Sequence, residues 1–223
     1  MNDERSAKAA TQALLASLAP GFGDPVHDTQ AVFRTLLDAL ARPGTIGVIE
    51  TPLPCADAAA GSPAAGSPAP ENRAGLAAFA ALLALADYAT PVWLAQPDAA
   101  LAAALRFHAG APLAPAPHAA AFAYVHDAHT LPPLDAFTSG SPESPELSAT
   151  VFVRVDALTG GAPLTLRGPG IATTRSVAPA GLPERFWRER AALAPLFPCG
   201  IDFYLVCGDS LMGLPRTTFV EMH

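Results

Sequence analysis

Three residues that suit an anionic ligand follow the second of two strands predicted near the C-terminus. The run 201–206 is apolar and rich in aromatic and β-branched side chains, which is typical of a strand covered on both faces. A glycine–aspartate pair then predicts a tight turn, and 211–214 is predicted to pair back as a second strand. Arg216, Thr217 and Thr218 come directly after it. One cation and two hydroxyls at the end of a buried strand are suited to binding an anion.

Asp202 is an ionisable residue inside the first of these strands. It lies between Ile201 and Phe203, and a carboxylate among such neighbours needs a charged or hydrogen-bonding partner. Arg34 and Arg216 are the candidate partners. The sequence leaves open whether the pair is a buried structural ion pair or part of a functional site.

Two further groups of cations have both a structural and a functional interpretation. Arg106 and His108 lie at the predicted C-terminal end of a helix, where a cation complements the helix dipole. The alternative is that they hold an oxygen of a phosphate or phosphonate. Three arginines on a helix predicted at 183–193 interleave with glutamates, which is typical of a solvated face. A phosphate-binding or partner-binding surface is the alternative there.

The single lysine excludes two classes of chemistry. Lys8 lies in the N-terminal tail, whereas pyridoxal-phosphate enzymes bind their cofactor as a Schiff base on a lysine inside the fold. We therefore expect no pyridoxal phosphate and no other cofactor. A P-loop also needs a lysine, so a P-loop kinase or ATPase is excluded. The Gly-Pro-Gly of 168–170 indicates a turn after a strand, with an anion-binding backbone nest beside Arg167 as the alternative.

Charge and composition argue against several kinds of partner. The net charge of −7 argues against a nucleic-acid surface. The three cysteines are widely spaced, which predicts reduced thiols, and the one close pair of histidines, His126 and His129, indicates a surface loop without bound metal. The longest apolar run, 76–86, is about half of the ~20 residues that a membrane span needs. We expect a cytoplasmic protein without membrane contact.

Helix and strand patterns alternate in the first half of the chain, and strands dominate the second. A helix capped by Asp24 or Asp28 is expected to end before Pro43 and Gly44. The remaining predicted helices are 73–87, 98–107 and 183–193, and the predicted strands are 45–50, 91–95, 121–125, 150–155, 164–167, 201–206 and 211–214. This order predicts an α/β fold with a mixed sheet flanked by helices.

One domain is predicted for residues 21–223, after a flexible segment at 1–20. The stretch 56–70 repeats Ala-Gly-Ser-Pro in tandem and contains no large side chain. Such a composition is typical of a disordered insertion.

Six blocks of residues form a specific pattern when they are taken together. Two are Phe-Pro-x-Gly-Ile-Asp at 197–202 and Cys-Gly-Asp-x-Leu-x-x-Leu-Pro-Arg-Thr-Thr at 207–218. The other four include Asp-Pro-Val-His-Asp-x-Gln from Asp24, Thr-Pro-Val-Trp-Leu from Thr90, Leu-Arg-Phe-His from Leu105 and Leu-x-Leu-x-Gly-Pro-Gly-Ile from Leu164. The blocks and their order resemble the H subunit of the bacterial phosphonate carbon–phosphorus lyase system (PhnH). The insertion at 56–70 is the main departure.

The resemblance implies a fold similar to the large domain of aminotransferase-type pyridoxal-phosphate enzymes, without the cofactor. It implies a subunit of the carbon–phosphorus lyase core complex beside the G, I and J subunits, and a homodimer when isolated. The associated step joins a phosphonate to the ribose of ATP, releases adenine and gives ribose 1-phosphonate 5-triphosphate. The resemblance assigns catalysis to the I subunit and leaves open whether the H subunit contacts ATP or the phosphonate, even indirectly.

Two other functions are compatible with the residues. One is a stand-alone α/β transferase or hydrolase that acts on a phosphorylated small molecule through Arg216, Thr217, Arg106 and His108. The other is a scaffold that binds no ligand. No catalytic constellation is evident from spacing, so we predict no catalytic residue.

Overall fold

The computed structural model describes residues 18–51, 53 and 75–222. The predicted insertion at 56–70 and most of the predicted flexible segment at 1–20 therefore lie outside the described residues. No helix in the described ranges is both long enough and apolar enough to cross a membrane.

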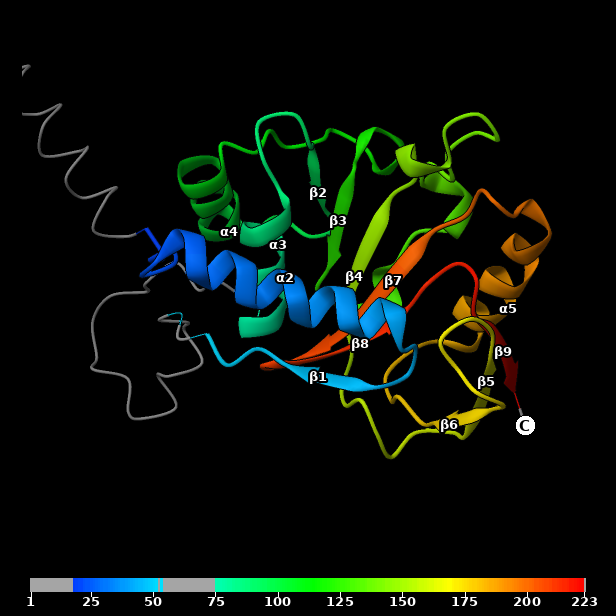
Figure 1. Ribbon diagram of the computed structural model, residues 1–223. Helices are drawn as coiled ribbons and strands as arrows, with labels where there is room; N and C mark the ends of the chain where they lie inside the picture. The colour runs from blue at the N-terminus through cyan, green and yellow to red at the C-terminus, as the bar shows by residue number, and fades with distance from the viewer. Residues whose placement is uncertain (1–17, 52, 54–74, 223) are drawn as a thin grey trace, which may run out of the picture.

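A six-stranded mixed sheet forms the centre of the molecule (Figure 1). Its order is β1-β8-β7-β4-β3-β2. Strands β2, β3, β4 and β7 are parallel to one another, whereas β8 pairs antiparallel with β7, and β1 pairs antiparallel with β8. The strands are β1 (Ile46–Val48), β2 (Val92–Leu94), β3 (Phe122–Val125), β4 (Thr150–Arg154), β7 (Asp202–Cys207) and β8 (Ser210–Leu214). The predicted α/β class with a mixed sheet is confirmed.

Two of the helices begin at an aspartate cap. Helix α2 (Pro25–Ala41) is capped by Asp24, whose carboxylate accepts hydrogen bonds from the backbone N–H groups of Val26 and His27. Helix α3 (Leu76–Leu85) contains no polar residue and packs deep in the core. Helix α4 (Ala99–Ala104) is capped by Asp98 and continues as a π-helical turn, η2 (Leu105–Ala109), where a regular helix was predicted.

Both faces of the central strands are buried, because successive residues along each strand point alternately into two separate hydrophobic cores. On one face, Tyr124, Phe152 and Tyr204 pack against α2 and α3, and the rings of Phe152 and Tyr204 stack at 5.0 Å. The Tyr204 hydroxyl donates a hydrogen bond to the Leu36 carbonyl of α2 at 2.9 Å, and burial raises the pKa of this phenol. On the other face, Phe203 and its alternate neighbours meet helix α5 (Glu184–Leu193), where Phe186 contacts Phe203 edge to face.

Helix α2 lies unusually close to β8. A Cβ atom added to Gly213 would be 2.4 Å from the Ala39 carbonyl oxygen of α2. The absence of a side chain at this strand position therefore lets the helix backbone approach the sheet.

A second, antiparallel sheet of three strands adjoins α5, in the order β6-β5-β9 (Figure 1). It consists of β5 (Leu164–Arg167), β6 (Arg175–Val177) and β9 (Phe219–Met222). The prediction of one mixed sheet was incomplete, since β5 belongs to this second sheet and neither β6 nor β9 was predicted. Both missed strands are short, and only one of their residues is buried, so no alternation of buried and exposed positions marks them in the sequence.

Candidate functional site

Asp202 and Arg216 form the most extensively bonded ion pair of the described residues. Asp202 is the first residue of β7, and Arg216 follows β8. The Arg216 Nη2 lies 2.6 Å from Asp202 Oδ2, and both side chains are only 17% exposed. The Arg216 Nε and backbone N–H also donate to the same carboxylate. Of the two arginines that were candidate partners of Asp202, Arg216 forms the ion pair and Arg34 does not.

The remaining donors of Arg216 hold two neighbouring loops in place. Its Nη1 donates to the Pro145 carbonyl at 2.9 Å and its Nη2 donates to the Ser148 hydroxyl. The guanidinium therefore joins the start of β7, the segment after β8 and the turn η6 (Pro145–Leu147). All three of its nitrogens have protein partners, and Asp202 offsets its charge.

A cavity of about 400 Å³ lies beside this ion pair. Three arginines line it, Arg167 at the end of β5, Arg190 on α5 and Arg216, together with Thr218 immediately before β9. Its apolar wall consists of Ala191, Leu193, Ala194, Ile201, Phe219 and Val220. The volume is in the range that small-molecule sites occupy.

Arg190 is the unusual member of the lining because it is a nearly buried cation, 7% exposed. Its Nη1 donates to the Thr218 carbonyl at 2.7 Å and its Nη2 to the Pro215 carbonyl at 2.6 Å. No carboxylate of the described residues forms a salt bridge with it. Burial lowers the pKa of Arg190 to about 10, with a smaller opposing effect from the charge of Asp202. The side chain is therefore a cation at neutral pH without an ion-pair partner.

Two polar atoms of the cavity lining lack a hydrogen-bond partner among the described residues. They are the Arg190 Nε and the Thr218 hydroxyl oxygen, both shielded from solvent. Thr218 is 2% exposed. Buried polar groups in folded proteins are nearly always hydrogen-bonded. Two buried polar atoms without a partner, on two residues in contact, are therefore an unusual feature of this cavity. At the rim, Arg167 pairs with Glu221 at 2.9 Å in a largely exposed ion pair.

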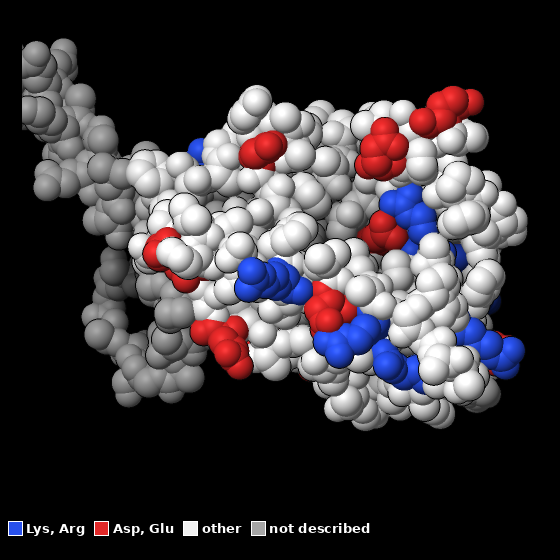
Figure 2. All heavy atoms as spheres, in the orientation of Figure 1, with Lys and Arg blue, Asp and Glu red and all other residues white. Residues whose placement is uncertain are grey.

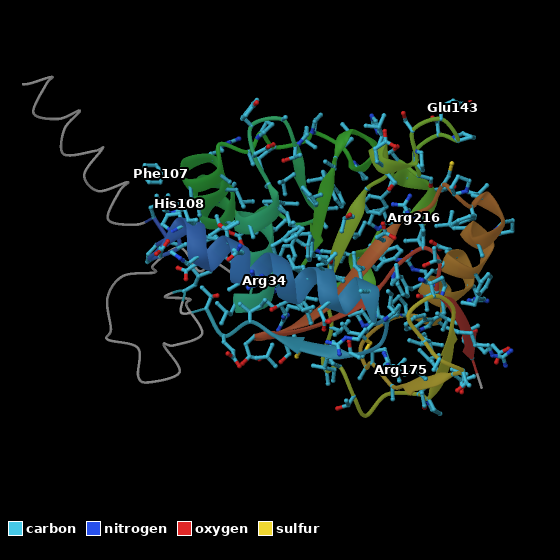
Figure 3. All side chains as sticks on the ribbon, viewed as in Figure 1. Arg34, Phe107, His108, Glu143, Arg175 and Arg216 are labelled. Atoms are coloured by element: carbon cyan, nitrogen blue, oxygen red, sulfur yellow. The ribbon has the colours of Figure 1, made fainter. Side chains whose placement is uncertain are left out.

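Three of the other predicted site residues, Arg34, Arg106 and His108, lie elsewhere, and Figure 3 labels Arg34 and His108. Arg34 lies midway along α2 with an exposed side chain. His108 lies on η2 near the start of α2, far from Arg216 (Figure 3), and its Nε2 is 2.9 Å from the Ala19 carbonyl oxygen. Arg106 belongs to the same turn, and Thr217 is half-buried beside Arg216. The six candidates therefore do not converge on one site.

A second polar group lies where the parallel strands end. His126 follows β3 and lies between the Tyr124 hydroxyl, 3.1 Å from Nδ1, and Arg154 Nη1, 3.4 Å from Nε2. Its backbone N–H donates to the Gln96 side-chain oxygen after β2. Within the described ranges, no group of three or more histidine, cysteine, aspartate or glutamate residues is arranged to hold a metal ion. The adjoining hollow measures only about 70 Å³.

Two further sequence interpretations can be compared with the structure. Residues 168–170 form a turn after β5, in which the Ile171 N–H donates to the Gly168 carbonyl at 3.2 Å. Cys207, for which a reduced thiol was predicted, is a free cysteine that lies half-buried at the end of β7, and its Sγ donates to the Asp156 carbonyl at 3.4 Å. Strand β7 ends at Cys207, where the sheet meets solvent.

The sequence matches the family model of the bacterial phosphonate metabolism protein PhnH over residues 20–221. This chain belongs to the PhnH family. The matched range includes every residue that lines the cavity and both residues of the Asp202–Arg216 pair. The resemblance carried by the six sequence blocks is thereby confirmed.

Two curated proteins are similar to this PhnH-family chain. The alpha-D-ribose 1-methylphosphonate 5-triphosphate synthase subunit PhnH of Rhizobium meliloti (strain 1021) is 40% identical over 202 residues, which cover 90% of this chain and 94% of that protein. The putative C-P lyase subunit protein HtxG of Stutzerimonas stutzeri is 39% identical over 83 residues, 37% of this chain and 43% of that protein.

Arg190 lines the cavity but was not among the site residues predicted from the sequence. Its helix was interpreted as a solvated charged face, with a phosphate-binding or partner-binding surface as the alternative, and the exposed pair of Arg188 with Glu184 fits the first interpretation. Arg190, however, lies three and four positions after Trp187 and Phe186, the two other buried residues of α5. Helical spacing from these aromatic residues was the signal that places Arg190 on the inner face.

Proposed function

We propose that this protein is a subunit of the carbon–phosphorus lyase complex that acts in phosphonate catabolism. The observation that carries the proposal is the family match over residues 20–221, joined by 40% identity to the Rhizobium meliloti synthase subunit over nearly the full length of both chains. The alternative of a stand-alone transferase or hydrolase has no comparable support. The step served is the formation of ribose 1-phosphonate 5-triphosphate from ATP and a phosphonate, with release of adenine.

An exposed apolar stripe on α2 supports a role within an assembly. Val26, Phe33 and Leu37 follow one another at helical spacing, and their side chains are 75%, 47% and 56% exposed. Apolar stripes of this kind on a helix surface often mark contacts with other chains. Figure 2 shows charged side chains of both signs scattered over this face, with uncharged surface between them.

The partners we propose are the G, I and J subunits of the complex, with a homodimer as the isolated form. The α2 stripe is the surface assigned to these contacts. In this arrangement the I subunit is the catalyst and the present chain is an accessory subunit without catalytic residues of its own. We further propose a cytoplasmic location and a fold related to the large domain of aminotransferase-type enzymes, without pyridoxal phosphate, since Lys8 is the only lysine.

Co-expression with the G, I and J subunits, followed by size-exclusion chromatography with mass determination, tests the proposal. We expect the wild-type chain to co-elute in one large stoichiometric particle. Phe33→Glu and Leu37→Glu should abolish co-elution, because each places a charge in an apolar contact. Leu147→Glu is the matched control, since Leu147 is 67% exposed on the turn η6, away from α2.

The possible failures of this experiment differ from one another. A wild-type chain that elutes alone while the other subunits assemble would overturn the proposed function. Assembly of both α2 variants would leave the function standing and exclude the α2 stripe as the contact surface.

A further inference from the structure

We propose that the cavity beside the Asp202–Arg216 pair binds a small organic anion with a phosphate or phosphonate head group, held by Arg190, Thr218 and Arg167. Neither the family match nor the names of the relatives assign a ligand site to this chain. The inference that an anion binds rests on the cavity itself. Only the choice of phosphonates as probes rests on the proposed function.

The balance of charge in the cavity is the first argument. Arg216 is offset by Asp202 and Arg167 by Glu221, with contacts of 2.6 and 2.9 Å. Arg190 has carbonyl partners only, so its positive charge has no ion-pair partner although its side chain is almost completely buried. A buried cation without a carboxylate is costly, and an anion entering the adjoining cavity would offset that cost.

The arrangement of donors is the second argument. Each terminal nitrogen of Arg190 donates one hydrogen bond to a main-chain carbonyl, and each carries a second N–H group. The unpartnered atoms are the Arg190 Nε and the Thr218 hydroxyl, while Arg167 approaches from a third element. Donors that come from three elements match a head group whose oxygens point in three directions. Both unpartnered atoms are shielded from solvent, so direct contact with a ligand in the cavity requires the side chains of Arg190 and Thr218 to shift.

The apolar wall is the third argument, and it concerns the rest of the ligand. Leu193 and Ile201 line the cavity, and Phe219 is 61% exposed, as the first residue of β9. An inorganic ion would leave this wall and most of the 400 Å³ unused. A ligand with an organic body covers the wall and gains affinity from the apolar surface that it buries.

Calorimetric titration of the full chain with phenylphosphonate, methylphosphonate and inorganic phosphate tests the proposal, with sodium chloride at equal ionic strength as the blank. We expect affinity to decrease in that order. Arg190→Gln should weaken phenylphosphonate binding by about tenfold or more. Arg167→Gln should weaken it by a smaller factor, because Arg167 is largely exposed.

Two variants separate ligand binding from folding. Thr218→Val should weaken binding while the melting temperature of the free protein is maintained or raised, because an unpartnered buried hydroxyl is replaced by a methyl group of similar size. Arg188→Gln is the charge-matched control on the same helix, with a side chain 64% exposed, and should change the Kd by less than about twofold.

Three results would overturn the proposal. One is the absence of heat beyond the chloride blank, and another is equal weakening by Arg188→Gln and Arg190→Gln, which would indicate general charge attraction. The third is a combination of two results: the wild type binds no phosphonate, and Arg190→Gln no longer co-elutes with the G, I and J subunits. That combination would indicate that the cavity receives an acidic side chain of a partner. If circular dichroism shows that Arg190→Gln is unfolded, the phosphonate affinities of Thr218→Val and Arg167→Gln test the proposal instead, and unchanged affinity in both variants would overturn it. Because the titration uses the isolated chain, its failure is distinct from a failure to assemble.

Discussion

Asp202 holds its strand in place through a single partner, and this leads to a prediction about stability. Asp202→Ala leaves the largely enclosed Arg216 without a counter-charge, so we expect it to lower the free energy of unfolding by about 2–4 kcal/mol. Urea denaturation monitored by circular dichroism measures this. The double variant Asp202→Ala/Arg216→Ala should be destabilised by less than the sum of the two single variants. Strict additivity would show that the two residues do not act as a pair.

Asp24 gives a prediction about pH dependence. Its carboxylate accepts the backbone N–H of His27, a contact that lowers the pKa of Asp24 below the usual 3.8, and it also lies 2.8 Å from the His27 ring. A lowered pKa contributes stability above pH 3.8 that is lost as the pH falls through the folded-state pKa. Asp24→Asn keeps a capping oxygen that does not titrate.

Melting temperatures of wild type and Asp24→Asn between pH 6 and pH 3 report this difference. We expect the gap between them to be widest near pH 6 and to close at the acid end, since only the wild-type cap protonates. A constant gap across the range would contradict the assignment of the cap.

Single residues were predictable where their environment could be inferred from neighbours in sequence. Asp202 was recognised because a carboxylate in an apolar strand needs a partner, and Arg216 was one of the two arginines considered. Arg190 was missed because the glutamates interleaved with the arginines of its helix favoured a solvated face, although its helical spacing from Phe186 and Trp187 indicated burial. The network around Arg216 was also beyond prediction, since Ser148 and Pro145 reach it from about 70 residues away in sequence.

At the scale of elements, the close approach of α2 to β8 leads to a further prediction. Gly213→Ala would place a Cβ 2.4 Å from the Ala39 carbonyl oxygen, so helix and strand must separate. We expect a loss of about 1–3 kcal/mol, as for other overpacked sites, and a melting temperature lower by several degrees. Gly23→Ala is the control, because a Cβ there would have its nearest neighbour at 4.0 Å. Equal melting temperatures for the two variants would contradict the packing argument.

Helices were predicted more completely than strands, and the reason is physical. Helix α2 begins at an aspartate cap followed by proline and ends before a proline–glycine pair, all signals within the segment itself. Strand β9 exists because it pairs with β5, whose Arg167 lies opposite Phe219. A pairing between residues so far apart in sequence leaves no mark on either segment alone, so the second sheet could not be predicted.

At the scale of the whole molecule, the stretch 56–70 provides a test of what the fold requires. Its small residues offer nothing to bury, so we expect its deletion to leave the melting temperature and co-elution with the partner subunits unchanged. Differential scanning fluorimetry and the chromatography described above measure both. A large drop in melting temperature would refute the expectation and assign a structural role to the stretch.

The position of β7 has a consequence for how this protein is made in the cell. Strand β7 lies between β4 and β8 at the middle of the six-stranded sheet, yet it is formed by residues 202–207. A ribosome must therefore complete most of the chain before the sheet can close, and until then the nascent chain carries an open β4 edge with buried-type residues such as Val151 and Phe152. Chaperone dependence during synthesis, and aggregation of fragments that stop short of β7, are the expected results.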